Sequence, residues 1–212
     1  VHLHLGGHRA GAIGNNAPIT PQGAKKAAQF LQLCDASGTP VIFIHNTTGF
    51  LVGVEPEQQG QVKHGAKLIQ AVANARIPKL SLIAGNSYGA GNYAMASRAL
   101  KPDFVFAWPS ARTAVMGGAQ AAKVMRIVAE GKLARAGAEL DAKTREFLDQ
   151  QAGALEGRLE AISEATHCSA RLFDDGIIDP ADTRSVLLLA LETCLEGRSA
   201  ELRPNTFGVA RL

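Results

Sequence analysis

Cysteines are few in this chain of 212 residues, and long apolar runs are missing. Cys34, Cys168 and Cys194 are widely spaced and make no C-x-x-C pair, which argues against a disulfide framework and a cysteine zinc site. Reduced cysteines fit the bacterial cytoplasm or the matrix of an organelle, and we expect the protein there. No apolar run reaches the roughly 18 residues of a membrane span, so we expect no membrane partner.

A strong charge bias is also missing, since 22 Lys and Arg stand against 19 Asp and Glu, with a formal net charge of +3. Proteins that bind nucleic acid usually carry a clustered basic surface, so we expect no nucleic-acid partner. The length suits one compact domain better than two. Because Val1 already stands within the strand-like segment "VHLHL", we expect a fragment or processed product of a longer protein.

The apolar patterns predict a mainly parallel α/β core, in which strands and helices alternate. A Gly-Gly turn inside "VHLHLGGHRAGAIGNN" predicts an opening hairpin. Further strands are expected at "VIFIH", "LSLIA", "DFVFAWP" and "TAVM". Helices are expected over residues 21–35, 61–75 and 92–99, from residue 117 onward, and after a capping signal at Asp182.

Two longer segments have less regular patterns. Residues 46–60 contain several glycines and are expected to form a loop too long for a simple connection. Residues 132–166 are rich in Ala, Glu, Lys and Arg, and we expect one or two solvated helices there, with a charged binding arm as the alternative. The tail, residues 203–212, has no regular periodicity.

Three histidines near the start of the chain raise the question of a metal site. His2 and His4 share one face of the first expected strand, and His8 follows them. No carboxylate or further histidine lies at a useful spacing for a metal ion. We therefore expect these side chains to line a strand face, and we expect no metal.

The segment "GNSYG", residues 85–89, fits the G-x-S-x-G pattern of a serine hydrolase. In that interpretation Ser87 is the nucleophile, and an acid and a histidine follow it in the chain. His167 is the only histidine after Ser87, and Asp103 and Asp141 are two of several acids. Because so short a pattern is easily met by chance, the hydrolase is kept as the weaker alternative.

The same turn suggests a second chemistry, which uses the backbone. A strand that ends at Gly85 and turns through residues 89–91 into a helix leaves N–H groups without partners at the start of that helix. Small residues let a ligand oxygen approach these donors, as in an oxyanion hole. The pair Gly117-Gly118 and the segment 47–50 offer similar turns. For each glycine alone, a tight turn or close packing is the structural alternative.

Several long motifs make the sequence recognisable. They occur in the order "GNNAPIT", "IHNTTGFLVG", "LIAGNSYGAGNYAM", "FAWPSARTAVMGGAQAA", "DDGIIDPADTR" and "NTFGVARL". With them the chain resembles the carboxyltransferase β subunit of biotin-dependent acyl-CoA carboxylases, and most of all the methylcrotonoyl-CoA and geranyl-CoA carboxylase branch. The resemblance implies a crotonase-like ββα superhelix. It also implies that residues 1–212 are the C-terminal carboxyltransferase domain, with the N-terminal half outside this chain.

The function implied by this resemblance is carboxyl transfer from carboxybiotin to an acyl-CoA. The biotin would arrive on a partner α subunit, which carries the biotin carboxylase and biotin carboxyl carrier parts. The acceptor in this branch is a branched 2-enoyl-CoA, either 3-methylcrotonoyl-CoA or geranyl-CoA. This chain would form the biotin-facing half of the site, and the β subunits would assemble as a hexamer.

The site residues implied by the resemblance gather at the glycine turns. The backbone N–H groups that stabilise negative charge on the biotin ureido oxygen fall on Ala90 and Gly91. The biotin pocket falls on Gly49, Phe50 and Gly89, and contact with the acyl-CoA falls on Tyr93, Gly117 and Gly118.

Two departures from the methylcrotonoyl-type pattern keep the substrate open. This chain has Gly117-Gly118-Ala119-Gln120 in place of Gly-Gly-Glu-Gln, and Gly85-Asn86-Ser87 in place of Gly-Gly-Ser. A stand-alone enoyl-CoA hydratase or isomerase of the crotonase fold is another alternative, although residues 92–99 contain no Asp or Glu to serve it. A non-catalytic assembly module is the third.

Overall fold

The computed structural model describes residues 1–135 and 141–200 of the chain. Within these residues the core is a seven-stranded sheet in the order β1-β2-β3-β4-β5-β7, with β6 paired to β4 beside that path. The strands are β1 His2–Leu5, β2 His8–Gly14, β3 Val41–Thr47, β4 Lys79–Tyr88, β5 Phe104–Ala107, β6 Arg112–Ala114 and β7 Gly176–Ile177. The helices are α1 Pro21–Ala36, α2 Val54–Gln58, α3 Gln61–Asn74, α4 Gly89–Ala94, α5 Gly118–Arg135, α6 Ala142–Ser163, α7 Ala165–Ser169 and α8 Thr183–Ser199, with 3-10 turns η1 Arg98–Leu100 and η2 Pro180–Asp182.

The strand pairing confirms the predicted α/β class. Strands β1 and β2 form the expected antiparallel hairpin, and Gly6 and Gly7 between them adopt positive φ values of 58° and 90°. The remaining pairs in the described sheet are parallel. Parallel neighbours need a crossover connection, which explains why a helix lies between β2 and β3, and again between β3 and β4.

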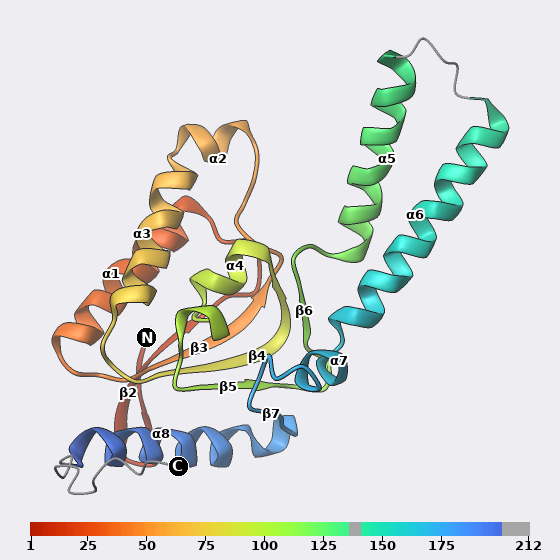
Figure 1. Ribbon diagram of the computed structural model, residues 1–212. Helices are drawn as coiled ribbons and strands as arrows, with labels where there is room; N and C mark the ends of the chain where they lie inside the picture. Colours follow the sequence, from red (N-terminus) through yellow and green to blue (C-terminus); the bar gives the residue numbers. More distant parts are fainter. Residues whose placement is uncertain (136–140, 201–212) are drawn as a thin grey trace, which may run out of the picture.

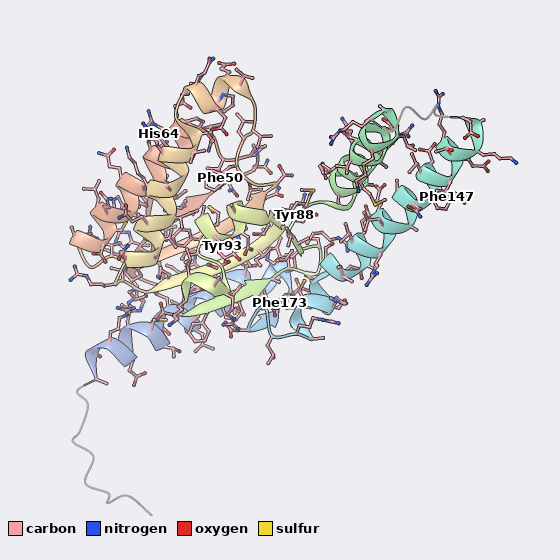
Figure 2. The ribbon with its side chains drawn as sticks, turned by 45° about the horizontal axis from the view of Figure 1, so that its top comes forward. Phe50, His64, Tyr88, Tyr93, Phe147 and Phe173 are labelled. Carbon is pink, nitrogen blue, oxygen red and sulfur yellow. The ribbon has the colours of Figure 1, made fainter. Side chains whose placement is uncertain are left out.

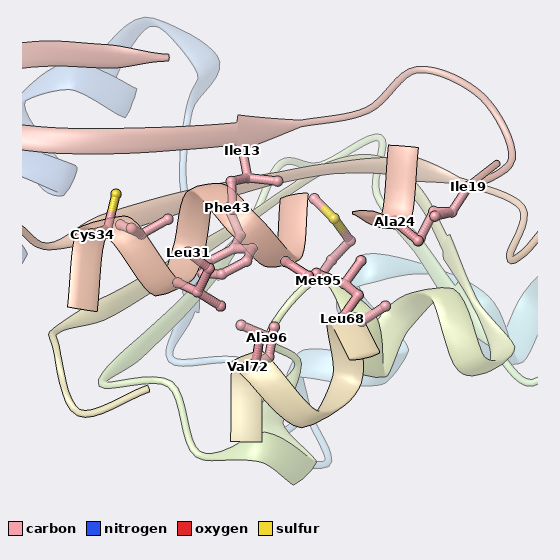
Figure 3. Packing of buried hydrophobic residues seen from close by; sticks show 14 of the residues in the cluster. Ile13, Ile19, Ala24, Leu31, Cys34, Phe43, Leu68, Val72, Met95 and Ala96 are labelled. Carbon is pink, nitrogen blue, oxygen red and sulfur yellow. The ribbon is translucent and has the colours of Figure 1, made fainter. Parts of the chain in front are cut away.

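Consecutive parallel strands with right-handed crossovers place their connecting helices on one face of a sheet. Helices α1, α3 and α4 accordingly cover one face, and α8 covers the other (Figure 1). The first layer is filled by buried side chains that include Leu31, Phe43 and Leu68 (Figure 3). The second layer is filled between β4 and α8, where Leu80 and Leu191 are both fully buried.

Helices α5 and α6 project from this body as an antiparallel pair (Figure 1). Within the described residues they confirm the expectation of one or two helices across residues 132–166, and α5 already begins at Gly118. Ala122 is the one buried residue of α5 in the described chain, and Ser163 is the one of α6. Most of the surface of this pair is therefore left open by the other residues that the structure describes.

The predicted end of β4 was wrong. The strand does not end at Gly85 but continues to Tyr88, and α4 begins at Gly89 and ends at Ala94, in place of the expected helix over 92–99. The reason is tertiary: β6 pairs with Asn86, Ser87 and Tyr88 and holds them extended although Gly, Asn and Ser are poor strand formers.

Two smaller expectations also need correction. The predicted loop over residues 46–60 contains the end of β3 and the short helix α2, whose first turn holds Glu55 and Glu57 near the favourable end of the helix dipole. Asp182 precedes α8, but its side chain makes no capping bond within the described residues. Asp179 caps the preceding 3-10 turn η2, where its carboxylate accepts a hydrogen bond from Ala181 N at 2.8 Å. The tail 203–212 lies outside the described residues.

Candidate functional site

The glycine turns meet at the carboxyl edge of β3 and β4. Gly89 adopts a φ of 54°, and a Cβ atom added there would lie 2.9 Å from the carbonyl oxygen of Val115. A Cβ added at Gly91 would lie 2.8 Å from the Cα of Gly49. Both distances are too short for a real side chain, so these positions need glycine. The structure thus brings Gly49, Gly89 and Gly91 together with the segment that follows β6.

The turn itself is built from small residues, Gly89, Ala90 and Gly91. Ala90 is exposed, and Gly91 is buried beside Gly49. In the described part of the chain no side chain caps the start of α4, which follows Tyr88 directly. The first N–H groups of a helix lack partners within the helix. Since α4 is only six residues long, these donors themselves, and not a large helix dipole, define the chemistry of the turn.

Apolar side chains surround the turn. Tyr93 is 47% exposed, Val115 88% and Met116 41%. Phe50 is half-buried, and its ring lies against Gly65 of α3, where an added Cβ would be 3.0 Å from the ring. Figure 2 shows Phe50, Tyr88 and Tyr93 on the side of the body that carries α4. The surface next to the donors is therefore suited to a mainly apolar ligand.

The glycine pair after β6 divides between two roles. An added Cβ at Gly117 would lie 3.3 Å from Cε2 of the Tyr88 ring, so Gly117 lies close to the turn. An added Cβ at Gly118 would lie 2.9 Å from the carbonyl oxygen of Glu156, so Gly118 packs against α6. Close packing of α5 against α6 accounts for Gly118.

Ser87 is fully buried, with 0% exposure. Its Oγ lies 2.8 Å from Nδ1 of His45 and accepts a hydrogen bond of 2.8 Å from Nδ2 of Asn92. His167, the histidine that the hydrolase interpretation required, makes neither of these bonds. A nucleophilic serine must reach its substrate from the surface of a pocket. The serine hydrolase alternative is therefore contradicted by the geometry.

His45 is fully buried, and sequence reasoning did not select it. Burial lowers the pKa of His45 from its usual 6.5 to about 4, because the charged ring loses its water; the Met95 carbonyl group opposes this drop in part. Within the described residues, Nε2 has no well-formed hydrogen bond. The ring is consequently neutral near pH 7.

An asparagine cluster supports the turn from the other side. The register of β3 against β4 shifts between His45 and Thr47, so the backbone groups there do not pair in the regular ladder. Asn46 fills this gap: its Oδ1 accepts a hydrogen bond of 3.0 Å from Asn86 N, and its own N–H donates to Oδ1 of Asn15 at 2.9 Å. A Cβ added at Gly85 would lie 2.5 Å from Oδ1 of Asn46, so a side chain there would displace the Asn46 amide.

A search for metal ligands in residues 1–135 and 141–200 finds no group of three or more His, Cys, Asp or Glu side chains. The ring of His2 lies 5.0 Å from the ring of Phe30, and His8 Nε2 lies 3.3 Å from Oε1 of Glu192. Among the helices of the same residues, none has the length and apolar character of a membrane span.

Comparison with known proteins identifies the family. The carboxyl transferase domain family matches residues 4–208. The chain belongs to the carboxyl transferase domain family. This confirms the resemblance drawn from the sequence motifs.

Relatives of this carboxyl transferase domain include β subunits of the expected branch. The crystal structure of P. aeruginosa geranyl-CoA carboxylase, β subunit, is 55% identical with a TM-score of 0.90, over 100% of this chain and 39% of that one. The probable methylcrotonoyl-CoA carboxylase β chain, mitochondrial, of Drosophila melanogaster is 43% identical over 98% of this chain and 35% of its own length. The chain thus spans little more than a third of these relatives.

A more distant relative confirms the fold class. Transcarboxylase 12S, whose structure is described as a hexamer assembly, is 30% identical with a TM-score of 0.77, over 98% of this chain and 38% of that one. The carboxyl transferase domain described here therefore has the expected crotonase-like fold.

The buried His45 ring predicts an acid-sensitive step in stability. Because the pKa of His45 is lower in the folded protein than in the unfolded chain, the stability that depends on the neutral ring is present in full above pH 6.5. It is lost as the pH falls toward about 4. The difference corresponds to roughly 3 kcal/mol of unfolding free energy. Denaturant unfolding across this range should show the loss, and His45→Gln should remove most of it. His2→Gln, at an exposed strand residue, should leave the pH profile as it is; an unchanged profile in His45→Gln would contradict the assignment.

Proposed function

We propose that this chain forms the biotin-facing half of the active site of a biotin-dependent acyl-CoA carboxylase. The reaction transfers a carboxyl group from carboxybiotin to a branched 2-enoyl-CoA. The observation that carries the proposal is the turn at Gly89–Gly91 in a carboxyl transferase domain: small residues at the carboxyl edge of a parallel sheet, where ligands of such sheets bind.

The chemistry supplied by this chain is stabilisation of negative charge by the backbone N–H groups of Ala90 and Gly91. Carboxybiotin supplies the carboxyl group when bound. If carboxybiotin binds at this turn, the N–H groups of Ala90 and Gly91 would stabilise negative charge that develops on an oxygen beside them. One such donor is typically worth about 3 kcal/mol in the transition state. Because the donors belong to the backbone, no side chain of this chain has to titrate.

The residues present fit a biotin ring. Its bicyclic body is largely apolar, and Val115 and Met116 offer exposed apolar surface beside the turn. The tight contact between Gly49 and Gly91 removes side chains that would block approach to the donors. We propose Gly49, Phe50 and Gly89 as the residues that shape this pocket.

The acceptor is proposed to be a branched enoyl-CoA, with geranyl-CoA and 3-methylcrotonoyl-CoA as the two candidates. Identity of 55% to a geranyl-CoA carboxylase subunit, against 43% to a methylcrotonoyl-CoA carboxylase chain, supports geranyl-CoA. Tyr93 is the proposed contact to the acyl chain, and Gly117, which lies against the Tyr88 ring, is proposed as a second contact. The hydratase or isomerase alternative is weakened because α4 contains no carboxylate.

The working enzyme is proposed to be larger than this chain. We propose that residues 1–212 act as the C-terminal carboxyltransferase domain, that a biotin carboxylase and carrier subunit brings the biotin, and that the β subunits form a hexamer in the cytoplasm or an organelle matrix. The projecting α5–α6 pair supports assembly, because Val124, Ile127 and Val128 expose about half of their surfaces along one side of α5.

The function is tested with the full-length subunit and its biotinylated partner. The pair should carry out ATP-dependent carboxylation of geranyl-CoA or 3-methylcrotonoyl-CoA, and inactivity with both would reject the proposed substrate class. Gly91→Ala should lower kcat about 100-fold, because the added Cβ displaces the turn from Gly49. Gly197→Ala, on α8 with nothing within 4 Å of the added Cβ, is the matched control and should keep full activity.

Substrate choice is tested at Tyr93. Tyr93→Ala should change the ratio of kcat/KM between geranyl-CoA and 3-methylcrotonoyl-CoA by about tenfold, since apolar contacts to part of an acyl chain discriminate on this scale. Phe173→Ala serves as control, because Phe173 is 51% exposed on the segment before β7. Equal ratios in the wild type and Tyr93→Ala would remove Tyr93 from the substrate contacts.

Assembly is tested with variants on the exposed face of α5. The double variant Val124→Asp/Ile127→Asp should lower the mass of the full-length subunit in light scattering from the hexamer to smaller species, because charges on a buried contact face are costly. Leu33→Asp, at a 59% exposed position of α1, should leave the mass unchanged. A hexamer that survives the double variant would exclude this face of α5 from the interface.

A further inference from the structure

We infer that His45, Ser87 and Asn92 form a positioning network that holds the turn Gly89–Gly91 in the place where its two N–H donors act. The inference rests on the proposed function, because the turn matters only if those donors meet a ligand. It adds the buried side chains that determine where the donors lie. None of the three side chains touches the reacting groups.

The network consists of two hydrogen bonds that meet at the Ser87 hydroxyl. The Nδ2 atom of Asn92 can only donate, so Ser87 Oγ accepts its hydrogen bond at 2.8 Å. The second hydrogen bond joins Ser87 Oγ to Nδ1 of His45, also at 2.8 Å, and the tautomer of His45 decides which of the two groups donates. Loss of the Ser87 hydroxyl would therefore break both hydrogen bonds.

The network ties together the three elements that meet at the turn. Ser87 is the last residue but one of β4, Asn92 is the fourth residue of α4, and His45 lies in β3. The bond from Asn92 to Ser87 spans the turn and joins its two flanks, and the bond from Ser87 to His45 fixes those flanks to the neighbouring strand. The position of Ala90 and Gly91 relative to the sheet is thereby fixed.

Burial makes the network selective for one geometry. Ser87 and His45 have 0% exposure, so water does not compete for their hydrogen bonds. The adjacent layer is apolar and includes Phe43, Ala94 and Met95. A buried polar atom without a hydrogen bond is costly in such surroundings, and a displaced turn would leave Ser87 Oγ and His45 Nδ1 without the bonds that they make here. The network therefore opposes displacement of the turn.

The test uses the complete carboxylase with its biotinylated partner, and it measures kcat and KM for the acyl-CoA. Ser87→Ala removes both hydrogen bonds at once and should lower kcat at least tenfold, with KM for the acyl-CoA within twofold of the wild type. His45→Leu should have a similar effect. His45→Gln keeps an amide that can donate to or accept from the Ser87 hydroxyl and should recover at least a third of the wild-type kcat.

Ser81→Ala is the matched control. Ser81 is also a fully buried serine of β4, and its hydroxyl donates to the carbonyl oxygen of Ala96 at 2.7 Å, away from the turn. We expect Ser81→Ala to lower the melting temperature and to leave kcat within twofold. A merely structural role of Ser87 would make the two serine variants behave alike, and that result would overturn the inference.

The remaining outcomes also decide the question. If Ser87→Ala does not assemble, Asn92→Asp replaces it: the shape is kept, the donor is lost, and Asn92 is only half-buried, so kcat should fall at least fivefold. Wild-type kcat in either Ser87→Ala or Asn92→Asp overturns the network. Failure of the proposed function looks different, because there the wild-type enzyme is inactive or Gly91→Ala retains full activity.

Discussion

The contact between Gly49 and Gly91 is the constraint on which the site depends. The loop after β3 and the first turn of α4 approach so closely that Gly91 has no room for a side chain, and Gly49 adopts a φ of 122°, which favours glycine. This contact brings the loop after β3 against the first turn of α4 and leaves Ala90 on the outside. The extended end of β4, its pairing with β6 and the register shift beside Asn46 are the changes in the sheet that allow the approach.

The molecule stabilises this edge in two chemically different ways. Between the sheet and its helices, apolar side chains such as Phe43 and Leu68 contribute non-directional stabilisation, which tolerates small shifts. Around the turn, hydrogen bonds of Asn46, Ser87 and Asn92 depend on direction and are lost when groups move by a fraction of an ångström. Stability thus comes mainly from the layers, whereas the geometry of the site comes from the polar side chains beneath it.

Because the donors belong to the backbone, the proposed catalysis does not depend on the titration of a side chain. Stabilisation of an oxygen by N–H groups does not change with pH, and the histidine nearest to the turn, His45, is held neutral by its burial. The acid sensitivity of the domain is then a property of folding and not of the donors. The same logic explains how a carboxyl transferase domain can work with a turn that contains no charged side chain.

Much of the fold was predictable from local pattern, because period-2 and period-3.6 repeats of apolar residues report burial directly. The hairpin, α1, α3, the buried strands and the helical arm followed from it, and ordered motifs indicated the family. The end of β4 was predicted wrongly, since its pairing with β6 depends on residues far along the chain.

The sequence analysis did not select the polar residues beneath the turn, because their contacts also join distant parts of the chain. The only local sign of them was a histidine and an asparagine, His45 and Asn46, directly after a buried apolar run. By itself, the sequence determined the alternation of elements, the position of the glycines and the family. Only the tertiary structure decided that Ser87 points inward to His45, because a hydroxyl is directed by its partners in space and not by its neighbours in the chain.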